Sequence, residues 1–320
     1  MLRSFFLSKE WLLWAWGGAL VIIFSLLIQI YITVQLNAWY GIFYDVLQKA
    51  NDINLFWECI IRFLYLAIPY IFIAMFSLFF TQHYAFRWRQ AISYYYFPFW
   101  SNSIKNIEGA SQRIQQDTYE FAQMLETLGI GFLRSIMTLI AFIPILWNLS
   151  KHVTIPVLGT IEGSLVWVAL ITSIGGMIIS YFVGIKLPKL EYNNQKVEAA
   201  YRKQLVYSED NRSYANITSL IELFLGLRVN YFRIFAHYSY FTLWGTLYGQ
   251  VMVILPYLIM APSLFTSVIT LGVVTQCSNS FNKVNDSFSY LIDNWTFITK
   301  FLSVIKRLRE FEKVLVYKVQ

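Results

Sequence analysis

The stretch WLLWAWGGALVIIFSLLIQIYITVQL (Trp11–Leu36) decides the fold class, because it contains no Asp, Glu, Lys or Arg. About 20 consecutive apolar residues are enough for a helix to cross the hydrocarbon core of a bilayer. Arg3 and Lys9 precede this run, and no small-residue cleavage site follows it. The pattern therefore predicts a first transmembrane helix and not a cleaved signal peptide.

Five further stretches predict spans of the same kind, although the last of them is much more polar. The six predicted spans are residues 11–36, 55–80, 128–147, 164–185, 240–261 and 268–299. Only 13% of the residues are charged, against about 25% in a soluble domain. This composition excludes a soluble enzyme and predicts an all-α, polytopic membrane protein, with residues 1–320 forming a single transmembrane domain.

The formal net charge of +7 is distributed unevenly along the chain. Most Lys and Arg residues precede the first span, follow the sixth, or lie in the two long connections Thr81–Thr127 and Lys186–Ser239. The predicted outer loops contain only Lys49 and Lys151. Because positively charged loops stay in the cytoplasm, we expect both termini to be cytoplasmic. The positive charge is thus a topology signal, and we expect no nucleic-acid partner.

The long inner connections are rich in helix-forming and aromatic residues, so we expect the transmembrane helices to continue into the cytoplasm. Six long helices with short outer turns are similar to the membrane domain of exporter-type ABC transporters. The chain has no G-x-x-x-x-G-K-[ST] motif, so we expect no nucleotide-binding domain in it. It also lacks H-E-x-x-H and G-x-S-x-G motifs. We therefore expect no enzymatic activity, no metal site and no cofactor.

The sixth predicted span carries one stripe of polar residues at helical spacing. The members that we select as candidates for a substrate cavity are Gln276, Asn279, Lys283, Asp286 and Asp293. Charged side chains do not face lipid without a large cost in free energy. Two interpretations remain, namely a hydrogen-bonded seam against a neighbouring helix and the wall of a water-filled cavity. We favour the cavity wall, because a seam does not need this many charges.

Acidic residues gather near the predicted inner membrane face. They form two groups, Glu191, Glu198 and Glu209 on one helix face, and Asp117, Glu120 and Glu126 before the third span. The first interpretation is a solvated helix surface whose charges are balanced by nearby lysines and arginines. The second is a proton relay, which buried carboxylates support. Arg134, inside the third span, is expected to stabilise a neighbouring carboxylate.

Several longer motifs resemble those of one family. They include NAWYGIFYDVLQ (Asn37–Gln48), GIKLPKLEYNNQKVEAAYRKQLVYSED (Gly184–Asp210) and ITLGVVTQ (Ile269–Gln276). In this order and spacing they resemble the SbmA/BacA family of bacterial inner-membrane peptide transporters. The resemblance runs from about Asn37 to Phe311, which is most of the chain.

The resemblance implies a homodimer in the bacterial inner membrane that imports peptides, including antimicrobial peptides and peptide-derived antibiotics, using the proton gradient. It implies proton-coupling roles for Glu126, Glu198 and Glu209. The aromatic residues that it connects with transport are Tyr44, Phe142 and Tyr207.

The chain departs from the family pattern at two carboxylates, since Gln116 and Gln204 stand where the family has glutamates. Asp117 is our candidate to replace the carboxylate missing at Gln116. The better-known members also carry an additional N-terminal membrane segment before the region that this sequence matches.

A proton-coupled peptide importer is therefore the predicted function, with peptides, the lipid bilayer and a second copy of the chain as partners. Two alternatives stay open. One is the membrane subunit of an ABC transporter that uses a separate ATPase. The other is a non-transporting membrane scaffold or envelope-lipid factor.

Overall fold

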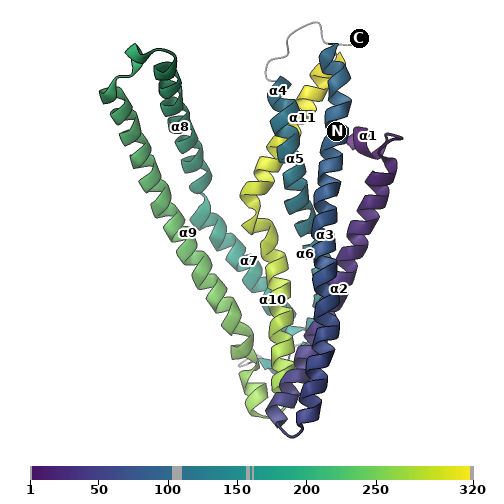
Figure 1. Ribbon diagram of the computed structural model, residues 1–320. Coiled ribbons are helices and arrows are strands. Elements are labelled where there is room, and N and C mark those ends of the chain that lie inside the picture. Colours follow the sequence, from purple (N-terminus) through teal and green to yellow (C-terminus); the bar gives the residue numbers. More distant parts are fainter. Residues whose placement is uncertain (1, 103–109, 156–158, 161, 318–320) are drawn as a thin grey trace. The chain divides into compact units, whose positions relative to one another are not determined.

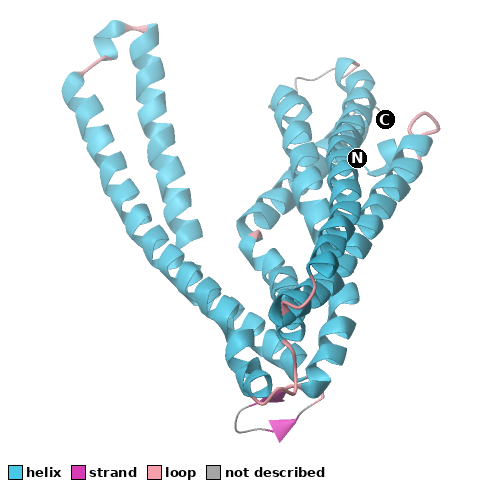
Figure 2. Ribbon diagram, turned by 60° about the horizontal axis from the view of Figure 1, so that its bottom comes forward, coloured by secondary structure: helices cyan, strands magenta, loops and turns pink. Residues whose placement is uncertain are grey.

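The computed structural model of the chain describes residues 2–102, 110–155, 159–160 and 162–317. Helices make up most of it, with one two-stranded antiparallel hairpin (Figures 1 and 2). In chain order the elements are α1 (Leu2–Phe6), η1 (Leu13–Gly17), α2 (Gly18–Lys49), α3 (Ile53–Ser101), α4 (Ala110–Gln112), η2 (Arg113–Asp117), α5 (Thr118–Met124), η3 (Leu125–Gly129), α6 (Ile130–Leu149), η4 (Ser150–His152), β1 (Thr154–Ile155), β2 (Gly159–Thr160), α7 (Ser164–Gly184), α8 (Leu187–Asp210), η5 (Arg212–Tyr214), α9 (Ile217–Phe265), α10 (Leu271–Asp293) and α11 (Trp295–Tyr317).

Five continuous helical rods are long and apolar enough to cross a membrane, counted among the described residues. They are Leu13–Lys49, Ile53–Ser101, Ala110–Leu149, Ser164–Asp210 and Ile217–Phe265. Each contains one of the first five predicted spans, except that the first rod begins at Leu13 and the first predicted span at Trp11. Most of the rods run well beyond the length that a bilayer needs, which confirms that the helices continue past their apolar segments.

The described residues contain five candidate spans and not the six that we expected, because the predicted span at residues 268–299 is not among them. Helix α10 ends at Asp293, and α11 begins at Trp295 after a break at Asn294. α10 is too polar to count among the candidate spans. The physical reason is its position, because α10 packs along α2 and α6. A helix that neighbours shield on part of its surface does not have to be apolar all round.

The chain forms two compact units, which we describe separately. Unit 1 consists of Met1–Leu170 and Pro256–Gln320, and unit 2 consists of Ile171–Leu255. In unit 1, α2 lies beside α3 and α10, α10 also lies beside α6, and α11 packs against α5 and α3. Helix α1 and the end of α11 lie at the same end of unit 1, opposite the turn between α2 and α3 (Figures 1 and 2).

An aromatic cluster holds α1 and α3 together in unit 1. The ring of Phe5 stacks on Trp88 with 5.1 Å between the ring centroids, and it meets Tyr84 edge to face at 5.4 Å. The Tyr84 hydroxyl donates to the carbonyl oxygen of Ala15 at 3.0 Å. Leu308 and Phe311 of α11 belong to the same buried cluster. Burial of these large apolar side chains is the main stabilising contribution at this end of unit 1.

Helices α2 and α10 approach each other closely at two glycines. A Cβ on Gly272 would collide with the carbonyl oxygen of Gly41, and a Cβ on Gly41 would lie 3.1 Å from Gln276 Oε1. The side chains of Asp45 and Gln48 cap the start of α10, because they accept hydrogen bonds from the backbone N–H groups of Gly272 at 2.8 Å and Leu271 at 3.1 Å. Small residues and a side-chain cap therefore fix α10 against α2.

In unit 2, α7 and α8 run antiparallel to α9 and pack along it. Trp244 Nε1 donates to the Ser180 hydroxyl at 2.8 Å, and the Tyr248 hydroxyl donates to the carbonyl oxygen of Thr172 at 3.3 Å. Gly176 provides the room that the Tyr248 ring needs, since a Cβ there would overlap it. These contacts hold α7 against α9 and leave α8 to pair with the earlier part of α9.

Candidate functional site

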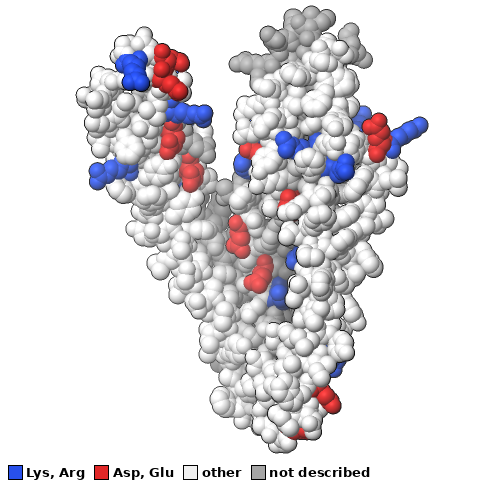
Figure 3. Space-filling model, viewed as in Figure 1, with Lys and Arg blue, Asp and Glu red and all other residues white. Residues whose placement is uncertain are grey.

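Charged side chains are not spread evenly over the two units. In Figure 3 many of the Lys and Arg atoms visible on unit 1 form a band near the end that carries α1 and α11. On unit 2, charges of both signs gather towards the turn between α8 and α9 (Figure 3). A smaller group of charges lies along the middle of unit 1 (Figure 3).

Helix α10 presents two different polar surfaces. Lys283, Asp286 and Asp293 are exposed, while Gln276 and Asn279 are half-buried. These five lie on one stripe of the helix, as their spacing predicts. The apolar residues Val274, Cys277, Phe281 and Val284 are buried on the packed side.

The packed side of α10 also contains hydrogen-bonding residues that the sequence did not reveal. Ser278, Ser280, Asn285 and Ser287 are all buried. The Asn37 amide on α2 donates to the Ser280 hydroxyl at 2.7 Å. A hydrogen-bonded seam therefore exists along the edge of the predicted stripe, since Ser280 lies one helical turn after Gln276 and one before Lys283. The charged residues of the stripe are not part of this seam.

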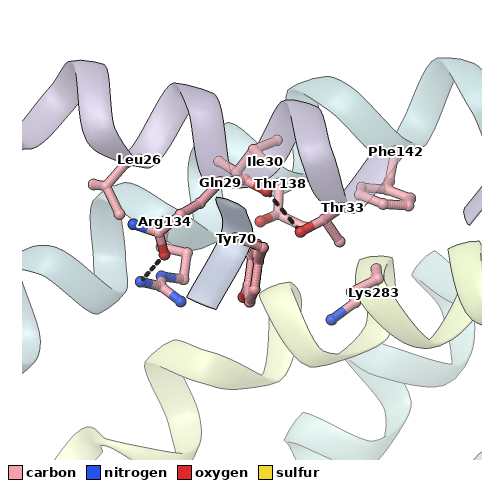
Figure 4. A pocket seen from close by; sticks show the side chains of 9 residues that line it. All are labelled: Leu26, Gln29, Ile30, Thr33, Tyr70, Arg134, Thr138, Phe142 and Lys283. Carbon is pink, nitrogen blue, oxygen red and sulfur yellow. Dashed lines mark hydrogen bonds between the residues drawn. The ribbon is translucent and has the colours of Figure 1, made fainter. Parts of the chain in front are cut away.

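A cavity of about 60 Å³ lies in unit 1 between α2, α3, α6 and α10 (Figure 4). Its lining residues are Leu26, Gln29, Ile30, Thr33, Tyr70, Arg134, Thr138, Phe142 and Lys283. The cavity thus brings together two of the predicted cavity residues, Phe142 and Lys283. Phe142 is buried and Lys283 is exposed.

Arg134 does not contact a carboxylate, contrary to our expectation from the sequence. Its Nη2 donates to Gln29 Oε1 at 3.1 Å (Figure 4). Among the described residues, neither Arg134 nor Lys283 has an acidic oxygen within 4.0 Å. Gln29 was not a candidate from the sequence, because a single glutamine in an apolar run carries no local signal.

Tyr44 and Glu126 lie elsewhere in unit 1. Tyr44 is half-buried near the end of α2, with its ring centroid 6.5 Å from that of Tyr40. Glu126 is half-buried in the π-helical turn η3. Such turns interrupt regular helices mostly at functional sites. The next residue, Thr127, accepts a hydrogen bond from the Tyr290 hydroxyl on α10 at 3.2 Å through its carbonyl oxygen.

Asp117 lies in an ion cluster that ties α11 to the start of the third rod. It is 1% exposed. Arg307 donates to both carboxylate oxygens, from Nε at 3.1 Å and from Nη2 at 2.9 Å, and Arg113 Nη1 adds a contact at 2.8 Å. Glu120 extends the cluster, because its carboxylate is 3.3 Å from Lys300 Nζ. Bidentate arginine–carboxylate pairs are among the stronger contacts in proteins, and this arrangement favours a structural role for Asp117.

In unit 2, two tyrosines of α9 pair with two glutamates of α8. The Tyr231 hydroxyl donates to Glu198 Oε1 at 2.8 Å, and the Tyr238 hydroxyl donates to Glu191 Oε1 at 3.0 Å. The two glutamates are seven residues apart in sequence, and so are the two tyrosines. This spacing corresponds to two helical turns. The equal spacing of the acidic and the aromatic residues was a signal that the sequence contained and our interpretation missed.

The other unit 2 candidates lie near the end of α8. Glu209 and Tyr207 are both exposed, and the ammonium group of Lys203 lies over the Tyr207 ring, 5.5 Å from its centroid. Gln204, which stands where the family has a glutamate, donates to the carbonyl oxygen of Tyr214 at 3.0 Å. This contact joins α8 to the turn η5 and needs the amide group that a glutamate lacks.

The chain is similar to several proteins that are named as transporters. The chain is 24% identical to the inner membrane ABC transporter ATP-binding protein YddA of Escherichia coli over 92% of this chain and 56% of the relative. It is 25% identical to an uncharacterised ABC transporter ATP-binding protein of Synechocystis over 95% of this chain and 47% of the relative. ABC transporter D family member 2, chloroplastic, of Arabidopsis thaliana is 28% identical over 72% of this chain and 33% of the relative.

The chain spans about half the length of the curated relatives that it matches most extensively. Several apolar helices and relatives named as transporters fit a protein of the bacterial inner membrane. A model described as the SbmA/BacA-like family matches residues 8–316, so this chain belongs to the SbmA/BacA-like family.

Proposed function

We propose that the protein imports peptides across the bacterial inner membrane, driven by the proton gradient, and that it works as a homodimer. The cargo includes antimicrobial peptides and peptide-derived antibiotics. Membership of the SbmA/BacA-like family supports transport. The charged stripe on α10 supports a polar translocation path, because charges at this depth must meet water or a polar partner.

The observation that carries the coupling part of the proposal is the contact between Glu198 and Tyr231. The phenol donates to the carboxylate at 2.8 Å and carries no charge that would hold the carboxylate ionised. A carboxyl group beside a hydroxyl keeps a hydrogen-bonding partner in either protonation state. Glu198 is therefore suited to exchange a proton, and we assign it to the coupling set together with Glu126 and Glu209.

Asp117 is left out of the coupling set. Its two arginine partners satisfy the carboxylate and supply two positive charges. Protonation would weaken three hydrogen bonds and remove the counter-charge that Asp117 gives to both guanidinium groups, which is costly at a buried site. We therefore assign Asp117 to anchoring α11.

Peptide binding is assigned to two sets of side chains, one in each unit. In unit 1 the polar stripe of α10 would contact the peptide backbone and charged side chains, with Tyr44 and Phe142 as aromatic contacts. In unit 2 Tyr207 would serve the same purpose from α8. Carboxylates along the path also attract cationic peptides over a distance, which raises the rate of encounter.

A second candidate function is the membrane subunit of an ABC transporter. The observation that favours it is the naming of the relatives, several of which are called ABC transporter ATP-binding proteins. The 320 residues themselves contain no P-loop motif. ATP-driven transport would therefore need a nucleotide-binding domain outside these residues.

Uptake of a labelled cationic peptide into proteoliposomes separates the two functions. We expect uptake when the outer solution is more acidic than the lumen, and loss of uptake when a protonophore removes the gradient. ATP on either side of the membrane is expected to have no effect. Uptake that needs ATP and ignores the protonophore would favour the ABC function instead.

A further inference from the structure

The cavity between α2, α3, α6 and α10 has room for a small ionic group. Its volume is about 60 Å³, and on this measure one water molecule needs about 10–15 Å³. The cavity can therefore hold several water molecules or one small ion or ionic group.

The lining of this cavity is dominated by hydrogen-bond donors. Arg134 and Lys283 contribute a guanidinium and an ammonium group, and neither has any accepting capacity. Tyr70 and Thr138 add hydroxyl groups. The Thr33 hydroxyl is already used, because it donates to the carbonyl oxygen of Gln29 at 2.8 Å (Figure 4). Such a set matches an acceptor with negative charge.

Arg134 supplies a second indication, because most of its N–H donors have no described partner. Its Nη2 donates to the oxygen of Gln29, which is 3% exposed, at 3.1 Å. A guanidinium group has several N–H donors, and this is its one hydrogen bond to the described residues. The other donors of Arg134 are therefore available to an acceptor in the cavity.

The charges around the cavity are also unbalanced. Among the carboxylates that the structure describes, none reaches ion-pair distance of Arg134 or Lys283. Asp286 lies on the same helix, three residues after Lys283, and attracts it from a longer distance. Two cations inside the apolar part of a membrane protein call for a nearby negative charge.

We infer that this cavity is a binding site for a small monovalent anionic group, either a chloride ion or a carboxylate carried by a substrate. Arg134 would hold the group from α6, and Lys283 would close the site from α10. Only the substrate carboxylate rests on the proposed function. A chloride site would stand whether or not the protein imports peptides.

Thermal unfolding of the purified full chain in detergent tests this site. We expect chloride and acetate to raise the melting temperature in a saturable manner relative to gluconate at equal ionic strength, because gluconate is a much larger anion. Lys283→Gln is expected to raise the anion concentration that gives half of the response about tenfold, which corresponds to a loss of about 1.4 kcal/mol in binding free energy. Lys49→Gln removes an exposed lysine of α2 and serves as the matched control with an unchanged response.

Gln29→Glu is a second variant, which keeps the test valid if Lys283→Gln fails to fold. The new carboxylate would pair with Arg134 and occupy the site from within. We therefore expect this variant to fold, to melt at or above the wild-type temperature, and to lose the anion response. A wild-type response equal to that of Gln29→Glu would overturn the inference, and so would an equal loss in Lys283→Gln and Lys49→Gln.

Thermal unfolding with a matched pair of short peptides identifies the source of the anionic group. One peptide has a free terminal carboxylate and the other has a terminal amide. Stabilisation by the free-carboxylate peptide alone, weakened by chloride, identifies a substrate carboxylate. Stabilisation by chloride without a difference between the two peptides identifies an ion site. No response to chloride, acetate or either peptide rejects both. The assay needs no transport, so failure of peptide import would not affect its result.

Discussion

Two buried or half-buried carboxylates, one in each unit, have very different partners. In unit 1, Asp117 is held by the guanidinium groups of Arg113 and Arg307. In unit 2, Glu198 accepts a hydrogen bond from the neutral phenol of Tyr231. The cluster in unit 1 also raises the pKa of Arg307 above its ordinary value, mainly through the hydrogen bonds with Asp117. Both members of that pair thus keep their charge.

The comparison separates carboxylates that stabilise the fold from carboxylates that can take up and release a proton during transport. A carboxylate with two cationic partners loses several contacts when it takes a proton. A carboxylate with a hydroxyl partner loses much less. All of these residues are acidic and lie near the predicted inner membrane face. The charge of their partners therefore divides them into two roles.

The largest expected effect is that of Glu198→Gln. It removes the titratable group and keeps the shape and the contact with Tyr231, so the variant should fold. We expect uptake of a labelled peptide into proteoliposomes to fall to the level of empty vesicles. Glu191→Gln is the matched control, because Glu191 makes the same kind of contact with Tyr238 without belonging to the family set. Full uptake by Glu198→Gln would remove the distinction between the units.

Asp117→Asn is expected to affect stability instead of coupling. The substitution leaves Arg113 without its counter-charge and Arg307 with the more distant Glu120 carboxylate at 3.7 Å. It should lower the free energy of unfolding by about 3 kcal/mol. Asp210→Asn, at the exposed end of α8, should change it by less than about 0.5 kcal/mol. Thermal unfolding in detergent measures both. A normally stable Asp117→Asn protein that has lost proton-dependent uptake would reverse the assignment.

The packing of the units can be compared through two glycines. Gly272→Ala in unit 1 should destabilise the protein by about 2 kcal/mol, because the new Cβ meets the backbone of Gly41. A Cβ added at Gly249 in unit 2 would have no atom of the described residues within 4 Å. Gly249→Ala should therefore stabilise α9 slightly through its higher helix propensity. Equal melting temperatures for the two variants would argue against a tight α2–α10 contact.

The smallest expected effect is that of Tyr231→Phe, which removes only the hydroxyl that donates to Glu198. We expect a loss of about 1 kcal/mol in the free energy of unfolding. Tyr240→Phe is the control, because Tyr240 is exposed and its described contact is with the His237 ring. Chemical denaturation of both variants gives the difference, and the absence of one would mean that the phenol contact adds no stability to unit 2.

Parts of this account were predictable from the sequence, since long apolar runs identify the first five spans and helical spacing identifies the polar stripe of α10. The packing of α10 was not predictable, because it depends on the neighbouring helices α2 and α6. The partner of Asp117 was not either, since Arg307 is 190 residues away along the chain. For Arg134 the sequence suggested a carboxylate partner, and folding instead brings Gln29 to it.

The most direct test of proton coupling is to measure proton entry and peptide entry in the same vesicles. A pH-sensitive dye in the lumen of proteoliposomes would report acidification when peptide is added outside at equal starting pH. Our account predicts peptide-dependent acidification with the wild-type protein and with Glu191→Gln, and none with Glu198→Gln. Peptide uptake by the wild-type protein without any change of lumenal pH would contradict the account.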